Sequence, residues 1–265
     1  MRVLIFLFLL FVIGGCSPRE KVQERKETPK KILSLSAAAT KVLLDLGVPP
    51  AAIDEYGVIA AGKRNIPVIG KGSAVSLEKM VELGINYVIL WDYQSDAARL
   101  FRKNGLAVIE LPPFRLDLYG SLIWKLGVML GRKEKAEQLV LEFEKQIEKL
   151  PPPEKRKNVY FELYGPMKSA GKESYTGDLL AKAGGVLLNK KTGLINAEKL
   201  LDHQPEIIFY VEGFSSEEEI IKRPGFSGFP AVKNKRIYAV PRLLITEGLA
   251  PLEAVHFFKN YISKE

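Results

Sequence analysis

The only cysteine of the chain, Cys16, ends a segment that is typical of an acylated N-terminus. Arg2 supplies a positive charge, residues 3–13 are apolar, and two glycines precede the thiol. An apolar run of about 11 residues is short for a transmembrane helix, which needs roughly 20, and this layout is typical of a cleaved signal peptide. After cleavage, the sulfur and the new amine of Cys16 can carry the two or more acyl chains that hold a protein firmly on a membrane. We predict a signal peptide at residues 1–15 and a lipid anchor at Cys16. An ordinary secretory signal and a short uncleaved anchor remain the alternatives.

Other patterns approach catalytic motifs without completing them. Residues 165–172 resemble a phosphate-binding loop, but the spacing is one residue too long and Glu173 stands where Ser or Thr would bind magnesium. Residues 70–75 lack the third glycine of a dinucleotide fingerprint. The two histidines of the chain lie far apart and have no partner cysteine, so we expect no zinc or manganese site built by the protein alone. The sequence favours binding over catalysis.

Composition and charge are those of a globular protein. Apolar residues make up 47% of the chain and charged residues 26%, which are ordinary values. There are 39 Lys and Arg against 31 Asp and Glu, with the two signs interspersed. An exported chain of this kind is not expected to bind nucleic acid, and an anionic ligand or acidic lipid surface fits the basic excess better. Residues 16–30 are rich in charge and proline, and we predict a flexible tether there.

The hydrophobic pattern predicts two α/β units. In each unit short apolar strands alternate with capped helices, which is the pattern of parallel βαβ structure. The two halves also share a repeat, in which a helix capped by Ser76 or Asn196 carries an early glutamate and is followed by a wholly apolar strand. The predicted strands cover residues 31–35, 86–91, 107–111, 158–163, 206–211 and 236–240, and the main predicted helices cover 76–84, 97–104, 176–183, 196–203 and 251–262.

A sustained helical period over residues 116–150 separates the two units. A continuous helix of about 34 residues would be roughly 50 Å long, which exceeds the width of one lobe. Gly131 is the one point where an interruption is expected, and three prolines at 151–153 end the pattern. We therefore predict two Rossmann-like α/β lobes, at 31–115 and 151–265, joined by a single long helix at 116–150, with a ligand cleft between the lobes.

Four motifs in order along the chain resemble those of the cobalamin and iron-siderophore binding proteins of ABC importers. The motifs are KILSLSAAAT at 31–40, SLEKM at 76–80, SAGKES at 169–174 and AEKL at 197–200. The likeness extends over residues 30–262. It implies a helical-backbone (class III) solute-binding protein, in which one long helix bridges two α/β lobes. It also implies a largely preformed cleft, because a single helix resists bending.

The resemblance further implies two contacts with a membrane permease. In this family one glutamate on each lobe meets arginines of the transporter, and the local motifs place these glutamates at Glu78 and Glu198. A glutamate in the first turn also stabilises its own helix by about 0.3–1 kcal/mol, which explains either residue alone. It does not explain the repetition in both halves, and we predict that Glu78 and Glu198 dock on the permease.

In this family the ligand is held by loops at the carboxyl ends of strands, where open α/β sheets generally bind ligands. Aromatic rings at these positions can pack on a large planar or lipophilic chelate, and basic groups can pair with its anionic groups. A place in the core or on the surface would explain each of these side chains equally well. Lys172 also belongs to a tight turn at Gly171. The predicted ligand-binding residues are Trp91, Tyr93, Arg115, Tyr164, Lys172, Tyr175, Phe214 and Arg242.

Together these features predict a lipid-anchored receptor, on the periplasmic or extracellular face of a membrane, that captures a metal chelate and delivers it to the transmembrane subunits of an ABC permease. A ferric siderophore is the first choice of ligand, cobalamin the second and heme the third, with Tyr93 or Tyr164 able to ligate heme iron through a phenolate. We expect a monomer without a cofactor or metal site of its own. Two alternatives stay open: an anchored enzyme, which needs a carboxylate pair or an activated nucleophile in the cleft, and an adhesion module, which needs a wide apolar patch.

Overall fold

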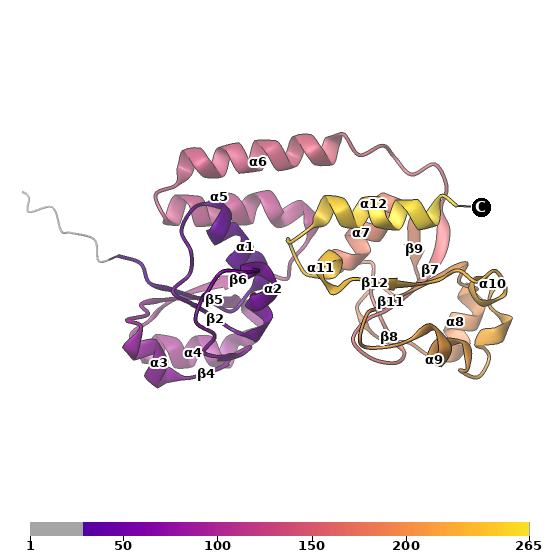
Figure 1. The fold of residues 1–265 in the computed structure, drawn as a ribbon, viewed down its shortest axis with the longest axis horizontal. Coiled ribbons are helices and arrows are strands. Elements are labelled where there is room, and N and C mark those ends of the chain that lie inside the picture. The colour runs from indigo at the N-terminus through magenta and orange to yellow at the C-terminus, as the bar shows by residue number, and fades with distance from the viewer. Residues whose placement is uncertain (1–28, 265) are drawn as a thin grey trace, which may run out of the picture.

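The computed structural model describes residues 29–264, and these form two α/β units side by side with long helices along their upper side (Figure 1). The predicted signal peptide at 1–15, Cys16 and nearly all of the predicted tether at 16–30 lie outside the described residues. Within residues 29–264, no helix is both long enough and apolar enough to cross a membrane.

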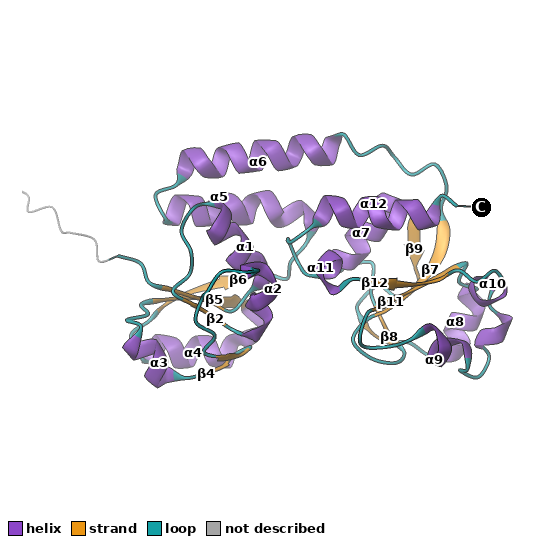
Figure 2. Cartoon of the chain, in the orientation of Figure 1, coloured by secondary structure: helices purple, strands orange, loops and turns teal. Residues whose placement is uncertain are grey.

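The N-terminal unit is built on a parallel sheet. The strand order is β2 (Ala52–Ile53), β1 (Ile32–Ser34), β5 (Tyr87–Trp91) and β6 (Ala107–Leu111). Around it lie α1 (Ala37–Asp45), α2 (Val58–Ala61), α3 (Leu77–Glu82), α4 (Ser95–Lys103) and the hairpin of β3 (Gly70–Lys71) and β4 (Ala74–Val75) (Figure 2). Because all strands of the sheet are parallel, their carboxyl ends lie at one edge of the sheet, and the following loops gather there.

The C-terminal unit repeats this plan with additions. Its sheet has the order β10 (Gly193–Leu194), β8 (Lys168–Ser169), β7 (Lys157–Glu162), β11 (Ile207–Val211) and β12 (Ile237–Val240), and β9 (Gly185–Leu187) pairs with the beginning of β7. The three strands β7, β11 and β12 are parallel. The helices of this unit are α7 (Tyr175–Ala183), α8 (Ala197–His203), α9 (Glu217–Ile221), α10 (Pro230–Lys233), α11 (Arg242–Ile245) and α12 (Pro251–Ile262). Phe161, Phe209 and Phe258 are fully buried and contact one another in its core.

The prediction of a single helix over residues 116–150 is wrong. A short 3₁₀ turn is followed by two helices, α5 (Tyr119–Met129) and α6 (Lys133–Glu148), which fold back on each other. The reversal occurs at Gly131, whose φ of 66° lies in the left-handed region that favours glycine and ends a helix. Gly127 allows the close approach, because a Cβ there would lie 2.2 Å from the Cβ of Ala136.

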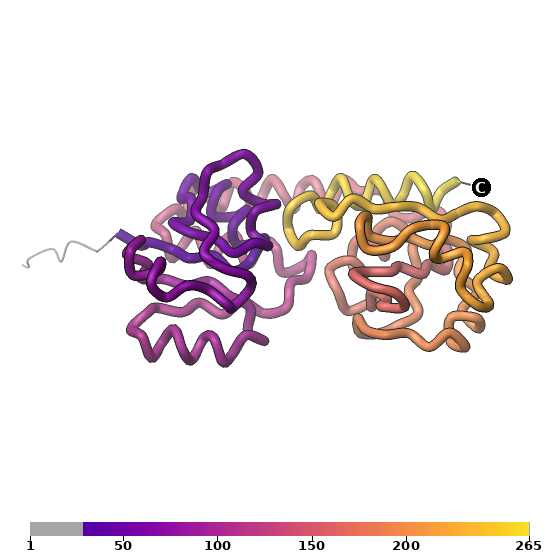
Figure 3. The backbone as a smooth tube through the Cα atoms, turned by 60° about the horizontal axis from the view of Figure 1, so that its bottom comes forward, coloured from indigo at the N-terminus to yellow at the C-terminus, as the bar shows by residue number. Residues whose placement is uncertain are grey.

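The bridge between the units is α6, a helix of 16 residues (Figure 1). Its Val140 side chain packs against the N-terminal core, Ile147 against the C-terminal core, and Phe143 against both. The rotated view in Figure 3 also shows two distinct units. The segment after β6 and the segment around α11 lie between them. Both sheets fall inside the predicted lobes, 31–115 and 151–265, and these limits as domain boundaries stay a prediction.

Candidate functional site

A cavity of about 850 Å³ lies between the two units, within the usual range for small-molecule sites. The N-terminal unit lines it through the loops that follow β1, β2 and β5 and through the β3–β4 hairpin. The C-terminal unit contributes the loops that follow β7, β11 and β12 and the segment before α12. The lining residues are Leu35, Ser36, Ala37, Asp54, Glu55, Tyr56, Lys71, Gly72, Ser73, Trp91, Tyr93, Gln94, Tyr164, Phe214, Arg242, Thr246 and Glu247.

Aromatic side chains stand on both sides of this cavity. From the N-terminal unit, Trp91 and Tyr93 stack with their ring centroids 6.4 Å apart and an interplanar angle of 13°. From the C-terminal unit, Tyr164 and Phe214 meet edge to face at 5.0 Å and 69°. Tyr93 is 71% exposed, Tyr164 43% and Phe214 42%, so large apolar surfaces border the cavity. Rings placed in this way can cover both faces of a flat ligand and release water from their own surfaces.

The charges around the cavity are mixed in sign. Asp54, Glu55 and Glu247 line it together with two cations, Lys71 and Arg242. The Nζ atom of Lys71 lies 3.4 Å from a carboxylate oxygen of Glu55, and both side chains are mainly exposed, so this ion pair adds little stability. The cavity is therefore not predominantly basic.

Arg242 lies across the cavity from the loop after β2. Its guanidinium carbon is 6.0 Å from the ring centroid of Tyr56, which is the outer limit of a cation–π contact. Arg242 belongs to the C-terminal unit and Tyr56 to the N-terminal unit, so this contact spans the cleft.

Two tyrosines of the cavity, Tyr93 and Tyr164, have raised pKa values. Burial, followed by the negative charge of Glu247, raises the pKa of Tyr93 and that of Tyr164 to about 12. The pKa of the Glu247 carboxyl is itself raised, chiefly by burial. Both phenols are therefore neutral hydrogen-bond donors at pH 7.

Three of the predicted ligand-binding residues, Arg115, Lys172 and Tyr175, do not line this cavity. The Nε atom of Arg115 donates to Asp178 of α7 at 2.7 Å, and a second guanidinium nitrogen bonds the other carboxylate oxygen. Arg115 thus ties the segment after β6 to the C-terminal unit. Lys172 is exposed in a turn, and its own backbone N–H donates a hydrogen bond to the carbonyl oxygen of Asn189. Tyr175 is buried in the C-terminal core.

Sequence reasoning also missed several cavity residues. Asp54 and Tyr56 follow β2, a strand of only two residues that begins two positions after Pro50 and gives no periodic signal. Lys71 lies in the short β3–β4 hairpin, which was not among the predicted strands. Glu247 comes after a four-residue helix. The sequence signal that could have identified these residues was their position after possible strand ends. Many other polar residues of the chain share that position.

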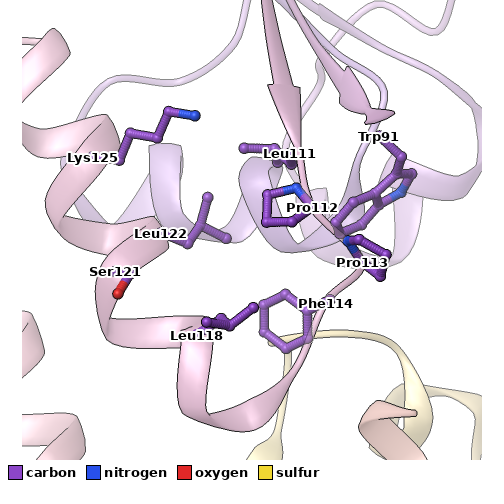
Figure 4. Close-up of a pocket in the computed structure, with 9 residues that line it drawn as sticks. All are labelled: Trp91, Leu111, Pro112, Pro113, Phe114, Leu118, Ser121, Leu122 and Lys125. Atoms are coloured by element: carbon purple, nitrogen blue, oxygen red, sulfur yellow. The ribbon is translucent and has the colours of Figure 1, made fainter. Parts of the chain in front are cut away.

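A smaller cavity of about 200 Å³ lies behind Trp91 (Figure 4). Leu111, Pro112, Pro113, Phe114, Leu118, Ser121, Leu122 and Lys125 line it together with Trp91. The Trp91 side chain borders both cavities, and its ring meets that of Phe114 edge to face at 6.5 Å. The residues that line this smaller cavity therefore help to hold the Trp91 indole in place.

The structure places Glu78 and Glu198 in matching positions. Each is exposed in the first turn of its helix, α3 or α8. The helices are capped by other side chains: Ser76 accepts a hydrogen bond from the N–H of Lys79 at 3.2 Å, and Asn196 accepts one from the N–H of Glu198 at 2.7 Å. In Figure 1 both helices lie on the lower side of their units, away from α6.

Among residues 29–264, no group of three or more His, Cys, Asp or Glu side chains is placed to hold a metal ion.

The sequence model of a family described as periplasmic binding protein matches residues 32–243. The chain belongs to this family, in agreement with the resemblance found in its motifs. It is a substrate-binding protein and not an enzyme.

Individual proteins similar to this chain are also described as substrate-binding proteins. An uncharacterised ABC transporter substrate-binding lipoprotein of Bacillus subtilis, YvrC, is 24% identical over 253 residues, which cover 87% of this chain and 79% of that protein. An ABC transporter substrate-binding protein from Listeria monocytogenes has a TM-score of 0.76 at 22% identity, covering 90% of this chain and all of that chain.

Two further solved structures share the fold. IsdE of S. aureus, complexed with heme, has a TM-score of 0.75 at 21% identity, covering 89% of this chain and 100% of that chain. The vitamin B12 binding protein BtuF of Vibrio cholerae has a TM-score of 0.70 at 19% identity, covering 88% and 98%. These likenesses confirm the predicted two-lobed α/β architecture.

Proposed function

We propose that this chain is the substrate-binding component of an ABC importer and that its interlobe cleft captures a large, flat metal chelate. The observation that carries the proposal is the pair of aromatic clusters, Trp91 with Tyr93 and Tyr164 with Phe214, which border one cavity from opposite lobes. The lipoprotein YvrC supports the role in an ABC importer, and the heme and vitamin B12 binding proteins that share the fold support this class of ligand.

The charges of the cleft change the order of candidate ligands. A ferric siderophore came first in the sequence prediction because Trp91 and Tyr93, together with three basic residues, suit an anionic chelate. The three basic residues were Arg115, Lys172 and Arg242. Of these, only Arg242 lines the cavity, where it is joined by Lys71 and three carboxylates. Aromatic surface of this extent with mixed charge favours a planar macrocycle of modest charge. We place heme first and keep ferric siderophore and cobalamin as alternatives.

Of the two tyrosines, Tyr164 is the better candidate to bind ferric iron. Burial and Glu247 raise its pKa, but the positive charge of Arg242 opposes that rise. Tyr93, in contrast, is surrounded by Glu247, Asp54 and Asp92, which all disfavour its phenolate. The positive charge of Arg242 beside Tyr164 would help to stabilise the phenolate that binds ferric iron.

A ligand screen tests the proposal. The purified protein is titrated with hemin, with a ferric hydroxamate, with a ferric catecholate and with cyanocobalamin, and binding is followed by absorbance and by the melting temperature. A ligand at 100 times its Kd stabilises the folded state by about 2.7 kcal/mol. We expect hemin to bind with one-to-one stoichiometry and to raise the melting temperature. A melting temperature unmoved by all four compounds would contradict chelate binding.

The proposal extends to the location and partners of the protein. Removal of residues 1–15 and acylation of Cys16 would place the two lobes on the outer face of a membrane, with residues 16–30 as tether. Glu78 and Glu198 are exposed on α3 and α8, two helices on the lower side of the lobes in Figure 1, and would contact the transmembrane subunits of the permease. We propose that the receptor acts as a monomer.

A further inference from the structure

The last residue of β7, Glu162, is a buried carboxylate that accepts hydrogen bonds from distant parts of the C-terminal unit. One of its oxygens accepts from the Tyr160 hydroxyl at 2.7 Å and from the backbone N–H of Met167 at 3.0 Å. The other accepts from the Ser215 hydroxyl and from Arg223 at 2.9 Å, and a second nitrogen of Arg223 bonds the first oxygen. Such a bidentate pair fixes geometry as well as charge.

Two of these donors, Met167 and Ser215, belong to the loops that carry the aromatic residues of the cleft in this lobe. Met167 ends the turn that begins after β7 and includes Tyr164, and its φ of 59° lies in the left-handed region, which is rare for residues other than glycine. Ser215 directly follows Phe214 in the loop after β11. The ring centroids of Tyr164 and Phe214 are 5.0 Å apart. Two loops that are far apart in the sequence are thus tied to the same carboxylate.

The N-terminal lobe contains a parallel arrangement. Asp54, buried directly after β2, accepts from the backbone N–H of Gly57 at 2.9 Å and from that of Gly72 at 3.1 Å. These donors lie in the loop with Tyr56 and in the hairpin with Lys71, both of which line the cavity. The recurrence indicates that one buried carboxylate after a strand holds two cleft loops in each lobe.

We propose that Glu162, held by Arg223, is a positioning residue for ligand capture, which sets the places of Tyr164 and Phe214 without contacting the ligand. The inference rests on the proposed function of the cleft. Burial would raise the pKa of Glu162, but the hydrogen bonds from Arg223, Ser215 and Tyr160 outweigh this effect and lower it, so the carboxylate stays ionised at pH 7. Preorganised loops bind more tightly because less ordering is needed on binding.

The test compares Glu162→Gln with Glu218→Gln. The first variant keeps the shape of the side chain but removes its charge and turns one acceptor into a donor. Glu218, on α9 of the same lobe, is exposed and pairs only locally with Lys222, so it is the matched control. In the ligand-free full-length protein, amide hydrogen exchange reports on the loops directly.

We expect Glu162→Gln to speed exchange at least tenfold in residues 163–168 and 212–216 together, with the loops at 55–57 and 70–75 unchanged. Affinity for hemin should fall about tenfold, and Glu218→Gln should change neither quantity. Unchanged exchange in both loops would overturn the proposal, and so would equal acceleration in all strands of the lobe, because that result indicates general destabilisation.

A second variant keeps the inference testable if Glu162→Gln does not fold. Ser215→Ala removes one donor, and we expect faster exchange in 212–216 alone, whereas unchanged exchange there would contradict the proposal. Because exchange is measured without ligand, it decides the role of Glu162 even if hemin does not bind to the wild-type protein. Failure of hemin binding would count against the proposed function only.

Discussion

Replacing Tyr93 and Tyr164 together by alanine is expected to weaken hemin binding by a factor of about 10³. Truncation of a buried aromatic anchor commonly costs 2 kcal/mol or more, which is roughly thirtyfold in Kd, and these two residues act from opposite lobes. Because both side chains are substantially exposed without ligand, the double variant should fold with little change in melting temperature. Titration calorimetry or absorbance measures the loss.

Trp124→Ala provides the matched control for this experiment. Trp124 is a large aromatic residue of similar exposure, 46%, but it lies on α5 and does not line the interlobe cavity. Its removal should leave Kd within a factor of about two. A control that loses as much affinity as the double variant, or a double variant that loses less than threefold, would place the ligand outside the proposed cleft.

Reversing both exposed charges, Glu78→Lys and Glu198→Lys, is expected to reduce uptake by at least tenfold while Kd in solution stays unchanged. Each substitution replaces an attraction to permease arginines by a repulsion, and docking through two distant points loses avidity when either fails. Neither glutamate lines the cavity. Accumulation of radioactive iron from hemin, in cells that depend on this receptor, measures the effect.

Glu82→Lys and Asp202→Lys are the matched controls for docking. Both residues are exposed on the same two helices, but near their C-terminal ends. We expect nearly normal uptake from the double control variant. Equal loss of uptake in both double variants would indicate a general charge effect, and a parallel loss of solution affinity would move Glu78 and Glu198 into the ligand site.

Regular structure was predicted well where hydrophobic runs were long enough to be periodic. The predicted strand at 107–111 coincides with β6, and the apolar run at 86–91 corresponds to β5. The helical period of 116–150 was also real, but periodicity does not distinguish one long helix from two that fold back on each other. The single residue that decides between them is Gly131, where the left-handed backbone reverses the chain.

The aromatic part of the site was predictable and much of its charge was not. Trp91, Tyr93, Tyr164, Phe214 and Arg242 follow recognisable strands, and topology alone brings their loops to one cavity. Arg115 also follows a strand, but it binds Asp178, which is distant in the sequence and belongs to the other lobe. No local pattern reports such a pairing. The acidic residues of the cavity follow elements too short to leave a periodic signal.

Diffraction at the iron absorption edge, from crystals of the protein grown with hemin, tests the central claim most directly. We predict one strong anomalous peak in the cavity between the Trp91–Tyr93 pair and the Tyr164–Phe214 pair, on the side of the Tyr164 hydroxyl. An iron peak on the outer surface, or in the smaller cavity behind Trp91, would contradict capture of the chelate between the two lobes.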